Sequence, residues 1–494
     1  NGAPAFHTAD LLKLYFYGYL NRTRSSRRLQ REANTNIEAI WLIKGARPGY
    51  KTIANFRKDN PKALKNTFRQ FNRFLLGQGL FDQELVAIDG SKFRAQNSKK
   101  NNYNEKKIDQ HLDYIQRKTD AYLELLQQAD AEEEASEINE VNNQHIAAQL
   151  DHLQQRKQKY DQLKTQVEKA RENGQTQVST TDPDARALPK KMNIVEVGYN
   201  LVTAAEAKNN FITNFKLLNE NDAYALADIA KDAADLLRPQ ADAPFTVLAD
   251  KGFDTGQQLQ QCAQQHITTI VAPRKRLTNK KNKAFAKDRF IYDEERDDYT
   301  CPQAKQLKTN GRWYQKKTYG QHRAVYKFKR YTCSYNICKN CPFKADCVGK
   351  PNLNNSKGRH LERSEYEPFI EENTDRYRLN KHLYRKRQTM VEHQFGTIKR
   401  QWGFDYTLVK TKEKVVGEFA LILCCYNLRR AISILGAAEL IKRLKNTKIN
   451  VLELIWRFLS RSATLFCQIT FCYRLFSNGS KSLKGRNLAA IKYI

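Results

Sequence analysis

The chain has 494 residues, with 85 Lys and Arg against 53 Asp and Glu, and its formal net charge is +32. This excess of positive charge argues for a polyanionic partner, and the length allows two to four domains. No stretch reaches the ~18 uncharged apolar residues that cross a bilayer, and no secretory signal is found, which argues against a membrane or exported protein.

Residues 1–82 are expected to be all-helical. The apolar run LLKLYFYGYL is followed by closely spaced arginines, and a turn at ARPGY precedes a helix that begins at Pro61. Short helices, tight turns and clustered arginines are typical of a helix-turn-helix-like DNA-binding domain, with Arg24, Arg27 and Arg28 as candidate DNA contacts. A helical domain with a solvated basic face is the alternative.

The next segment begins as a strand and continues as long helices. LVAIDGSKFRA predicts an apolar strand that runs into Asp89-Gly90. No Gly or Pro then occurs before Gly174, and apolar residues recur at helical spacings across residues 101–175. This pattern predicts an antiparallel helical hairpin with coiled-coil packing, inserted into the core.

Residues 83–100 and 176–273 are expected to form that core. NIVEVGYNLVTAA and NNFITNFKLL predict two strands, and a helix, the strand TVLAD with Asp250, a second helix and the strand ITTIVAP follow. This order predicts an α/β fold of the ribonuclease-H-like type, with acidic residues at neighbouring strand ends. Another mixed α/β sheet is the alternative.

The rest of the chain is expected to form three parts. Residues 274–380 read as a basic, Cys-rich insertion, and residues 381–435 as a helix that carries Glu392 followed by helices that close the core. Residues 436–494 read as a C-terminal helical tail.

Asp89, Asp250 and Glu392 are the candidate catalytic residues. Carboxylates at two strand ends and on one helix can converge on two Mg²⁺ (or Mn²⁺) ions, which activate a water or a 3′-hydroxyl for attack on a phosphodiester. Burying the carboxylate of Asp250 in an apolar strand is costly unless it is paired or metal-bound. Asp182 and Asp184 in TTDPDAR are the competing ligands, although their Pro-containing context suits a turn.

The cysteines of the insertion predict a structural Zn²⁺ site. Cys338 and Cys341 form a CxxC pair, Cys347 is a third ligand, and Cys301 is the favoured fourth, with Cys333 as its alternative. Four thiolates close the coordination shell, so this zinc would not be catalytic. A loose group of unligated cysteines is the other interpretation.

Taken in order, the motifs TIANFRKDN, AIDGSKFRAQNSKKNN, LADKGFD, CKNCPFKADC and VEHQFGTIKRQWGF resemble those of bacterial insertion-sequence transposases of the DDE type. Within that family the chain looks like the subgroup with an N-terminal helical transposase domain and a Cys cluster before the catalytic Glu. The resemblance covers nearly the whole chain up to about residue 435.

The resemblance implies that the three carboxylates bind two Mg²⁺ ions and that Tyr384, Arg387 and Lys399 are the family's residues around the glutamate. Together with Arg400, the two basic residues are expected to contact DNA. It further implies an enzyme of the bacterial cytoplasm and nucleoid that cuts the ends of its element and joins them to target DNA. Its expected partner is double-stranded DNA, both terminal repeats and target, bound by a homodimer.

Two other functions stay open at this point. One is a metal-dependent DNA nuclease of the same fold, which cuts without joining. The other is a decayed copy that only binds DNA through its basic surface.

Overall fold

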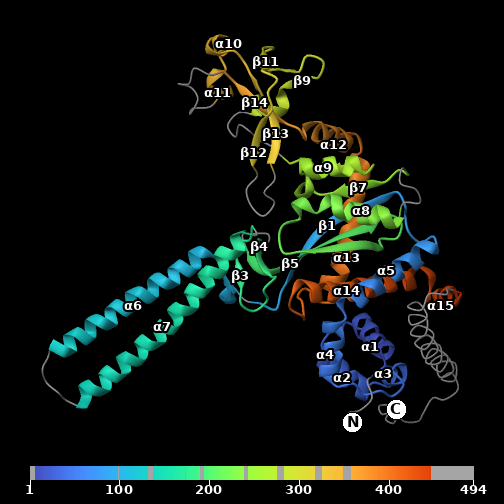
Figure 1. The fold of residues 1–494 in the computed structure, drawn as a ribbon. Coiled ribbons are helices and arrows are strands. Elements are labelled where there is room, and N and C mark those ends of the chain that lie inside the picture. Colours follow the sequence, from blue (N-terminus) through green and yellow to red (C-terminus); the bar gives the residue numbers. More distant parts are fainter. Residues whose placement is uncertain are drawn as a thin grey trace, which may run out of the picture.

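The computed structural model describes residues 6–97, 99–131, 137–172, 174–189, 194–237, 243–274, 283–317, 325–348 and 358–446. The chain is mixed α/β, as the sequence predicts, and Figure 1 shows a central sheet with helical parts around it. Most of the predicted tail, from residue 447 onward, lies outside the described residues.

Five helices form the N-terminal part, which lies beneath the central sheet in Figure 1. They are α1 (Thr8–Leu20), α2 (Ser26–Thr35), α3 (Ile37–Leu42), α4 (Tyr50–Asp59) and α5 (Pro61–Gly77). Pro61 is the first residue of α5, because its fixed backbone angle suits a helix start and its missing N–H costs nothing there. The Asn36 side chain accepts hydrogen bonds from two backbone N–H groups at the start of α3.

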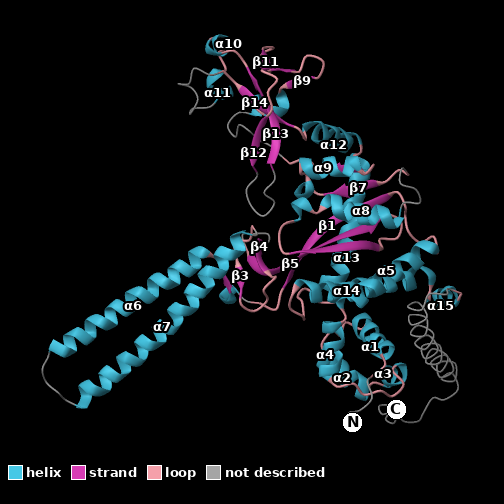
Figure 2. Cartoon of the chain, in the orientation of Figure 1, coloured by secondary structure: helices cyan, strands magenta, loops and turns pink. Residues whose placement is uncertain are grey.

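The central sheet contains six strands, which Figure 2 shows in magenta. They are β1 (Leu85–Arg94), β4 (Arg186–Pro189), β5 (Val195–Glu206), β6 (Ile212–Leu218), β7 (Thr246–Ala249) and β8 (Thr268–Val271). The order is β5, β1, β7, β8, and both β4 and β6 pair with β5. Strands β1, β7 and β8 are mutually parallel, whereas β5 is antiparallel to β1, β4 and β6.

Helices cover both faces of this sheet. Alternate residues of β1 point to opposite faces, so Val86 and Ile88 join the main core with α8 (Leu226–Leu237) and α9 (Gly256–Gln264). Ala87 packs on the other face against Met390 of α13 (Lys381–Phe395). Helix α12 (Glu367–Leu379) contacts β8 and α9, although the sequence analysis assigned its residues to the insertion.

Asparagine side chains cover both edges of the sheet. Asn427 on α14 (Lys412–Leu435) accepts from Ile212 N over 2.9 Å and donates to Ile212 O over 2.8 Å. Asn72 on α5 donates to Ile212 O and Thr213 O, and Asn373 pairs with both backbone groups of Val271. These contacts satisfy edge groups that would otherwise be left unpaired beneath helices.

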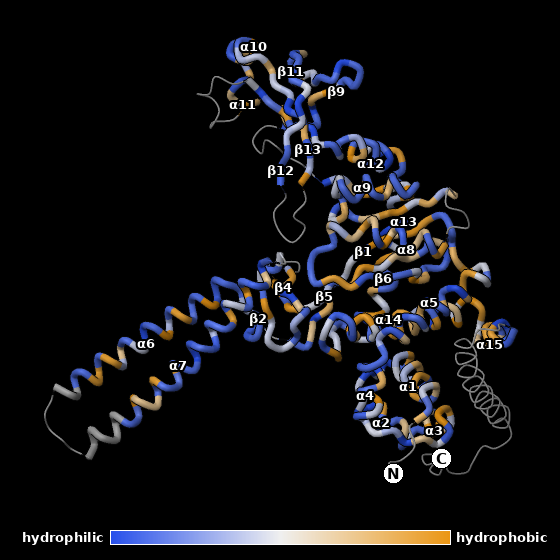
Figure 3. Tube along the Cα trace, viewed as in Figure 1, coloured by the Kyte–Doolittle hydropathy of each residue, from blue (hydrophilic) through white to orange (hydrophobic). Residues whose placement is uncertain are grey.

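The helical hairpin predicted from the sequence consists of α6 (Glu105–Ala131) and α7 (Glu137–Glu172). It projects away from the sheet in Figure 1, and its base is joined by the short strands β2 (Asn102–Tyr103) and β3 (Val178–Ser179). Its buried core holds Ile108, Ile115, Leu153, Tyr160, Leu163 and Val167. Figure 3 shows blue residues interspersed along both helices, as expected for a hairpin with one narrow apolar seam.

The Cys-rich insertion is a second, smaller antiparallel sheet at the top of Figure 1. Its elements are β9 (Ile291–Asp293), β10 (Asp298–Thr300), β11 (Gln306–Thr309), β12 (Tyr314–Lys317), β13 (Val325–Thr332), α10 (Tyr335–Lys339), α11 (Lys344–Val348) and β14 (His360–Ser364). Two three-residue turns of 3₁₀-helix, Lys283–Phe285 and Lys287–Arg289, precede β9. A third, Lys99–Asn101, lies before the helical hairpin.

Within the described part of the chain, no single helix is long and apolar enough to cross a membrane. Helix α14 and the following α15 (Ala437–Lys445) pass that test only as a pair, with a bend of 109° between them. Most of α14 is buried in the main core, where it packs against α5.

Candidate acidic site

Neighbouring parallel strands bring Asp89 and Asp250 together. Ile88 of β1 and Ala249 of β7 are register partners, and each aspartate is the next residue along its strand. The Asp250 carboxylate caps a 3₁₀ turn, η4 (Lys251–Phe253), by accepting from Gly252 N. The Asp89 carboxylate accepts from Gly90 N over 2.8 Å. The register of β1 and β7 therefore places Asp89 and Asp250 side by side on neighbouring strands.

Arg387 joins this pair from helix α13. Its Nη1 lies 3.4 Å from Oδ2 of Asp89, and its guanidinium lies 5.6 Å from the centre of the Tyr384 ring. Burial raises the pKa of Asp89 to about 6, opposed by Arg387 and the Gly90 N–H and supported by the nearby carboxylates of Asp250 and Asp222. The helix predicted to carry the third carboxylate is thus held against β1 by an ion pair.

Glu392 lies on the same helix but is not part of this contact. Its side chain is exposed, and its Oε1 accepts a hydrogen bond of 2.9 Å from Gln388, one turn earlier. The helix continues into a π-helical turn, η8 (Gly396–Gln401), a rare geometry that often occurs at functional sites. The structure brings Asp89 and Asp250 together. Among the contacts of the described residues, none joins Glu392 to either aspartate.

Asp222 is a carboxylate at this site that the sequence analysis missed. It begins a 3₁₀ turn, η3 (Asp222–Tyr224), just before α8, and the site's electrostatics place it near both Asp89 and Asp250. Burial raises the pKa of Asp222, and the charge of Asp250 adds to this shift. Its signal in the sequence was slight, because it lies at the end of the polar run LNEND rather than after an apolar strand.

The two basic residues predicted beside the glutamate differ in exposure. Lys399 donates from Nζ to the backbone oxygen of Lys92 over 2.5 Å and lies 4.2 Å from the centre of the Phe93 ring, on the strand that carries Asp89. Arg400 is exposed. Both lie in the π-helical turn: Lys399 contacts β1 three and four residues beyond Asp89, and Arg400 is exposed.

Arg24 requires a correction to the expected set of DNA contacts. Its side chain is only 5% exposed, because it pairs with Glu418 over 3.5 Å and donates to Tyr406 O over 2.7 Å. It therefore fastens the N-terminal helices to α14 and cannot reach a ligand at the surface. Arg27 and Arg28 are exposed, as a DNA contact requires.

The competing carboxylates Asp182 and Asp184 have structural partners. Asp182 is fully buried, and its Oδ1 accepts from the Tyr199 hydroxyl over 2.9 Å and from Thr411 N over 3.0 Å. Asp184 accepts from Lys412 N over 2.8 Å. These bonds hold the loop that starts α14, which favours the turn interpretation over a metal site.

Four of the cysteines of the insertion, Cys301, Cys333, Cys338 and Cys347, gather in the core of the second sheet. Cys333 and Cys338 are buried and belong to its core, with Cys301 and Cys347 packed against them. Burial and a hydrogen bond with Cys338 raise the pKa of Cys333 to about 12, and burial raises that of Cys347 to about 11. Backbone N–H groups of Lys305 and Arg359 point at the sulfurs of Cys301 and Cys338, over 3.3 and 3.5 Å.

No group of three or more His, Cys, Asp or Glu side chains among the described residues already has the arrangement of a metal site. The chemistry of the acidic site nevertheless fits a hard divalent cation, since Mg²⁺ and Mn²⁺ bind carboxylate oxygens. The backbone of Gly252 lies close against the Asp250 carboxylate, since a Cβ on Gly252 would lie 2.7 Å from Oδ1 of Asp250. The thiols of the insertion similarly match the ligands that Zn²⁺ prefers.

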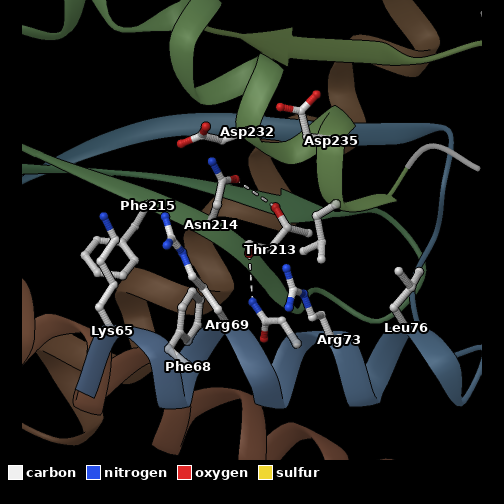
Figure 4. Close-up of a pocket in the computed structure, with 12 residues that line it drawn as sticks. Lys65, Phe68, Arg69, Arg73, Leu76, Thr213, Asn214, Phe215, Asp232 and Asp235 are labelled. Carbon is white, nitrogen blue, oxygen red and sulfur yellow. Dashed lines mark hydrogen bonds between the residues drawn. The ribbon is translucent and has the colours of Figure 1, made fainter. Parts of the chain in front are cut away.

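A pocket of about 420 Å³ lies away from this site, between α5, β6 and α8. Figure 4 shows Lys65, Arg69 and Arg73 rising from α5 toward Asp232 and Asp235 of α8. The two carboxylates offset most of the positive charge, so the pocket does not have the electrostatics of a strong anion site.

Residues 149–428 match the model of a family described as "Transposase DDE domain", and residues 1–59 match a model described as "Transposase domain (DUF772)". The first match spans more than half of the chain and contains Asp250 and Glu392, whereas Asp89 precedes it.

No curated protein gives a significant match. A solved structure described as "Cryo-EM structure of piggyBac transposase synaptic complex with hairpin DNA" aligns over 99% of this chain and 79% of its own, at 9% identity and a TM-score of 0.34. That likeness is too slight to support a statement about fold or partners.

Proposed function

Because the chain belongs to the transposase DDE domain family, we propose that it cleaves the ends of an insertion sequence and joins them to target DNA. The observation that carries this proposal is the adjacency of Asp89 and Asp250 on neighbouring parallel strands, with Arg387 paired to Asp89. The family resemblance drawn from the sequence is confirmed by both family models.

We assign the central sheet to the ribonuclease-H-like type. The strand order β6, β5, β1, β7, β8, in which only β5 runs against the others, supports this assignment. In this arrangement the first and fourth strands of the core are neighbours. Their equivalent positions hold Asp89 and Asp250, so the proposed chemistry lies at the centre of the sheet.

The proposed roles follow from these positions. Asp89 and Asp250 would hold divalent ions, and Glu392 is the proposed third carboxylate. When bound, two Mg²⁺ ions supply activation of the attacking oxygen and stabilisation of the leaving oxygen of the phosphodiester. Arg387 orients the Asp89 carboxylate and keeps part of its charge neutralised before DNA arrives. Lys399 contacts the strand that carries Asp89, and it is proposed to contact a phosphate of the DNA.

DNA contact is proposed for the exposed basic residues, namely Arg27, Arg28 and Arg400, together with Lys399 and Arg387 at the site. The net charge of +32 supports a polyanionic partner, since neutralising phosphates releases counterions and supplies much of the affinity for DNA. Cutting two element ends together requires two active sites, so a homodimer on DNA is part of the proposal.

We further propose a structural Zn²⁺ in the Cys-rich insertion. The grouping of four thiols, from Cys301, Cys333, Cys338 and Cys347, and the two N–H groups that point at sulfurs support it. Cys301 packs against the buried Cys333 and Cys338, so the fourth ligand beside Cys338, Cys341 and Cys347 is proposed to be Cys301 or Cys333. The choice between these two is tested below.

The test is Mg²⁺-dependent cleavage and joining of a labelled duplex with the element's end sequence. Asp250→Asn is compared with Asp228→Asn, which changes an exposed carboxylate on α8 that pairs with Lys216. The proposal predicts cleaved and joined products from the wild type and Asp228→Asn, and neither from Asp250→Asn. Cleavage without joining by the wild type would support a nuclease, and DNA binding alone would support a decayed copy.

A further inference from the structure

The second sheet, in the Cys-rich insertion, exposes one of its two faces, and a basic hollow lies at the end of that face. The other face holds a buried core that includes Leu307 and Tyr331. We propose that the exposed face binds a single-stranded segment of DNA, with a phosphate at Lys305 and Lys308 and a base against Tyr335. This inference rests on the proposed function and deepens it, because it makes an unpaired strand part of the substrate and gives that strand a site outside the acidic cluster.

The register of β11 and β13 separates the two faces of this sheet. Lys308 and Thr332 are cross-strand partners, so their side chains share a face, and both residues are exposed. The preceding residues, Leu307 and Tyr331, are fully buried in the core on the other face. Arg330 lies two residues before Thr332 on β13, so it belongs to the exposed face. The exposed face therefore runs from β11 along β13.

A hollow of about 740 Å³ lies where this face meets α10. Lys305 and Lys308 line it, and its lining contains no aspartate or glutamate. The ion pairs formed within the second sheet do not involve either lysine. Asp298, the other cross-strand partner of Lys308, is buried and does not line the hollow. The hollow therefore presents positive charge without a compensating carboxylate, unlike the pocket beside α5, which two aspartates line.

The walls of the hollow match a nucleotide base as well as a phosphate. Tyr335 and Ile337 line it, and Ile337 is 44% exposed. Nζ of Lys344 lies 5.0 Å from the centre of the Tyr335 ring, which places a further cation beside the ring. Unpaired bases stack on aromatic rings while neighbouring cations contact their phosphates. In a duplex the bases are already stacked and paired, so only an unpaired strand offers a base to this hollow.

The exposed face continues this chemistry beyond the hollow. Tyr314 on β12 and Phe328 on β13 are cross-strand partners, and their ring centres lie 5.7 Å apart. The guanidinium of Arg330 lies 5.6 Å from the centre of the Tyr314 ring. Lys316 and Arg330 both pair with Glu362, over 3.0 and 3.4 Å, so two cations share one carboxylate. This part of the face keeps a net positive charge beside an exposed ring, which suits a second nucleotide of the same strand.

The experiment measures binding of a fluorescein-labelled single-stranded oligonucleotide to the full-length protein by fluorescence anisotropy, without added divalent cations. The test variant combines Lys305→Ala with Lys308→Ala. The control combines Lys317→Ala with Lys327→Ala, which removes the same charge from exposed positions on the opposite face of the sheet. We expect the test variant to bind the oligonucleotide at least roughly tenfold more weakly, with the slope of log affinity against log salt reduced by about 1.4 for two lost phosphate contacts. The control should bind with the affinity of the wild type.

Tyr335→Leu tests the base contact separately. Leucine keeps an apolar side chain in the hollow but removes the ring, so single-strand binding is expected to fall at least roughly fivefold, whereas binding of a duplex of the same sequence should keep its affinity. The melting temperature checks that the fold is intact. If Tyr335→Leu lowers it, the lysine variant still decides the test, because both of its substitutions are at exposed positions.

Wild-type single-strand affinity in the lysine variant, or an equal loss in the control, would overturn the inference, because the face would then contribute no more than its charge. An equally large loss of duplex binding in the lysine variant would show contact with a duplex backbone and would overturn it as well.

The outcomes also separate this inference from the proposed function. If the wild type joins an element end to target DNA while the lysine variant binds the single strand normally, the proposed function stands and this inference fails. If the wild type neither cleaves nor joins DNA, the proposed function itself fails, whatever the single-strand affinity.

Discussion

Nη1 of Arg387 lies 3.4 Å from Oδ2 of Asp89, which joins the helix that carries Glu392 to the strand at the centre of the sheet. The two residues are separated by 298 positions in the sequence. The contact is partly shielded from water, since the two side chains are 17% and 26% exposed. Arg387 therefore acts on the charge of Asp89 as well as on the position of the helix.

Arg387→Ala is expected to shift the acidic limb of the pH–cleavage profile to higher pH. The arginine lowers the pKa of Asp89, so its removal lets that pKa rise further above about 6. Arg387→Lys keeps the charge and is expected to give a smaller shift. Single-turnover cleavage measured from pH 5 to 9 tests this, with the exposed Arg385→Ala as the control. An unchanged profile for Arg387→Ala would contradict the role of the ion pair.

Asp89→Asn is expected to stabilise the metal-free fold at neutral pH relative to the wild type. In the folded protein burial raises the pKa of Asp89 from 3.8 to about 6, so its stabilising contribution is present below about pH 4 and is lost as the pH rises through 6. The stability advantage of Asp89→Asn over the wild type is expected to be roughly 1–3 kcal/mol larger above pH 6 than at pH 4. The advantage is reduced because Arg387 loses its ion-pair partner. Urea unfolding in EDTA at pH 4 and 7.5 measures it. An equal stability advantage of Asp89→Asn at both pH values would show that the pKa of Asp89 is not raised in the folded protein.

Substitutions of two arginines in the N-terminal domain are expected to affect different properties. One lowers the stability of the fold, and the other weakens DNA binding. Arg24→Ala leaves Glu418 buried without its partner and should cost about 3–5 kcal/mol of folding free energy. Arg28→Ala should leave the melting temperature unchanged, weaken DNA binding and reduce the salt dependence by about one counterion. Thermal melting and fluorescence anisotropy at several salt concentrations distinguish these results. A wild-type melting temperature for Arg24→Ala would show that the buried pair of Arg24 and Glu418 contributes little to the folding free energy.

Asn427→Leu is expected to destabilise the protein by about 1–3 kcal/mol, because Ile212 N loses its partner beneath α14. The exposed Asn66→Ala, on the neighbouring helix α5, is the control and should change stability by less than about 0.5 kcal/mol. Denaturant unfolding measures both. Equal effects for the two variants would contradict the capping of the sheet edge by Asn427.

The Cys-rich insertion is expected to release one Zn²⁺ per chain when its thiols are modified, as measured with a chromogenic chelator. Cys338→Ser should lower the zinc content strongly, because Cys338 lies in the buried group with Cys333. The fourth ligand is identified by comparing Cys301→Ser with Cys333→Ser, since only the loss of a true ligand releases the metal. Protein purified without chelators that contains no zinc would contradict the proposal.

The sequence predicted the elements whose pattern is local. The apolar runs before Asp89 and Asp250 define strands by themselves, and the long helical spacings of residues 101–175 define a hairpin. Partners far apart in the chain were not predictable, such as Arg24 and Glu418, because a clustered arginine has the same local pattern on a surface as in a core.

Asp222 shows a second limit of the sequence analysis. Its proximity to Asp250 depends on glycines in two other segments that leave room for it, and no apolar run or periodic spacing marks it. Asp182 shows the reverse case, because a carboxylate that looked like a competing ligand serves a loop through Tyr199 and Thr411.

The most direct test of the central claim is strand transfer of a pre-cleaved element end with a free 3′-hydroxyl into a plasmid, in Mg²⁺. This step isolates joining, so it separates a transposase from a nuclease of the same fold. The account predicts joined product from the wild type and none from Asp250→Asn, although both bind the DNA. Joining by Asp250→Asn, or its absence in a wild-type protein that still cleaves DNA, would contradict the account.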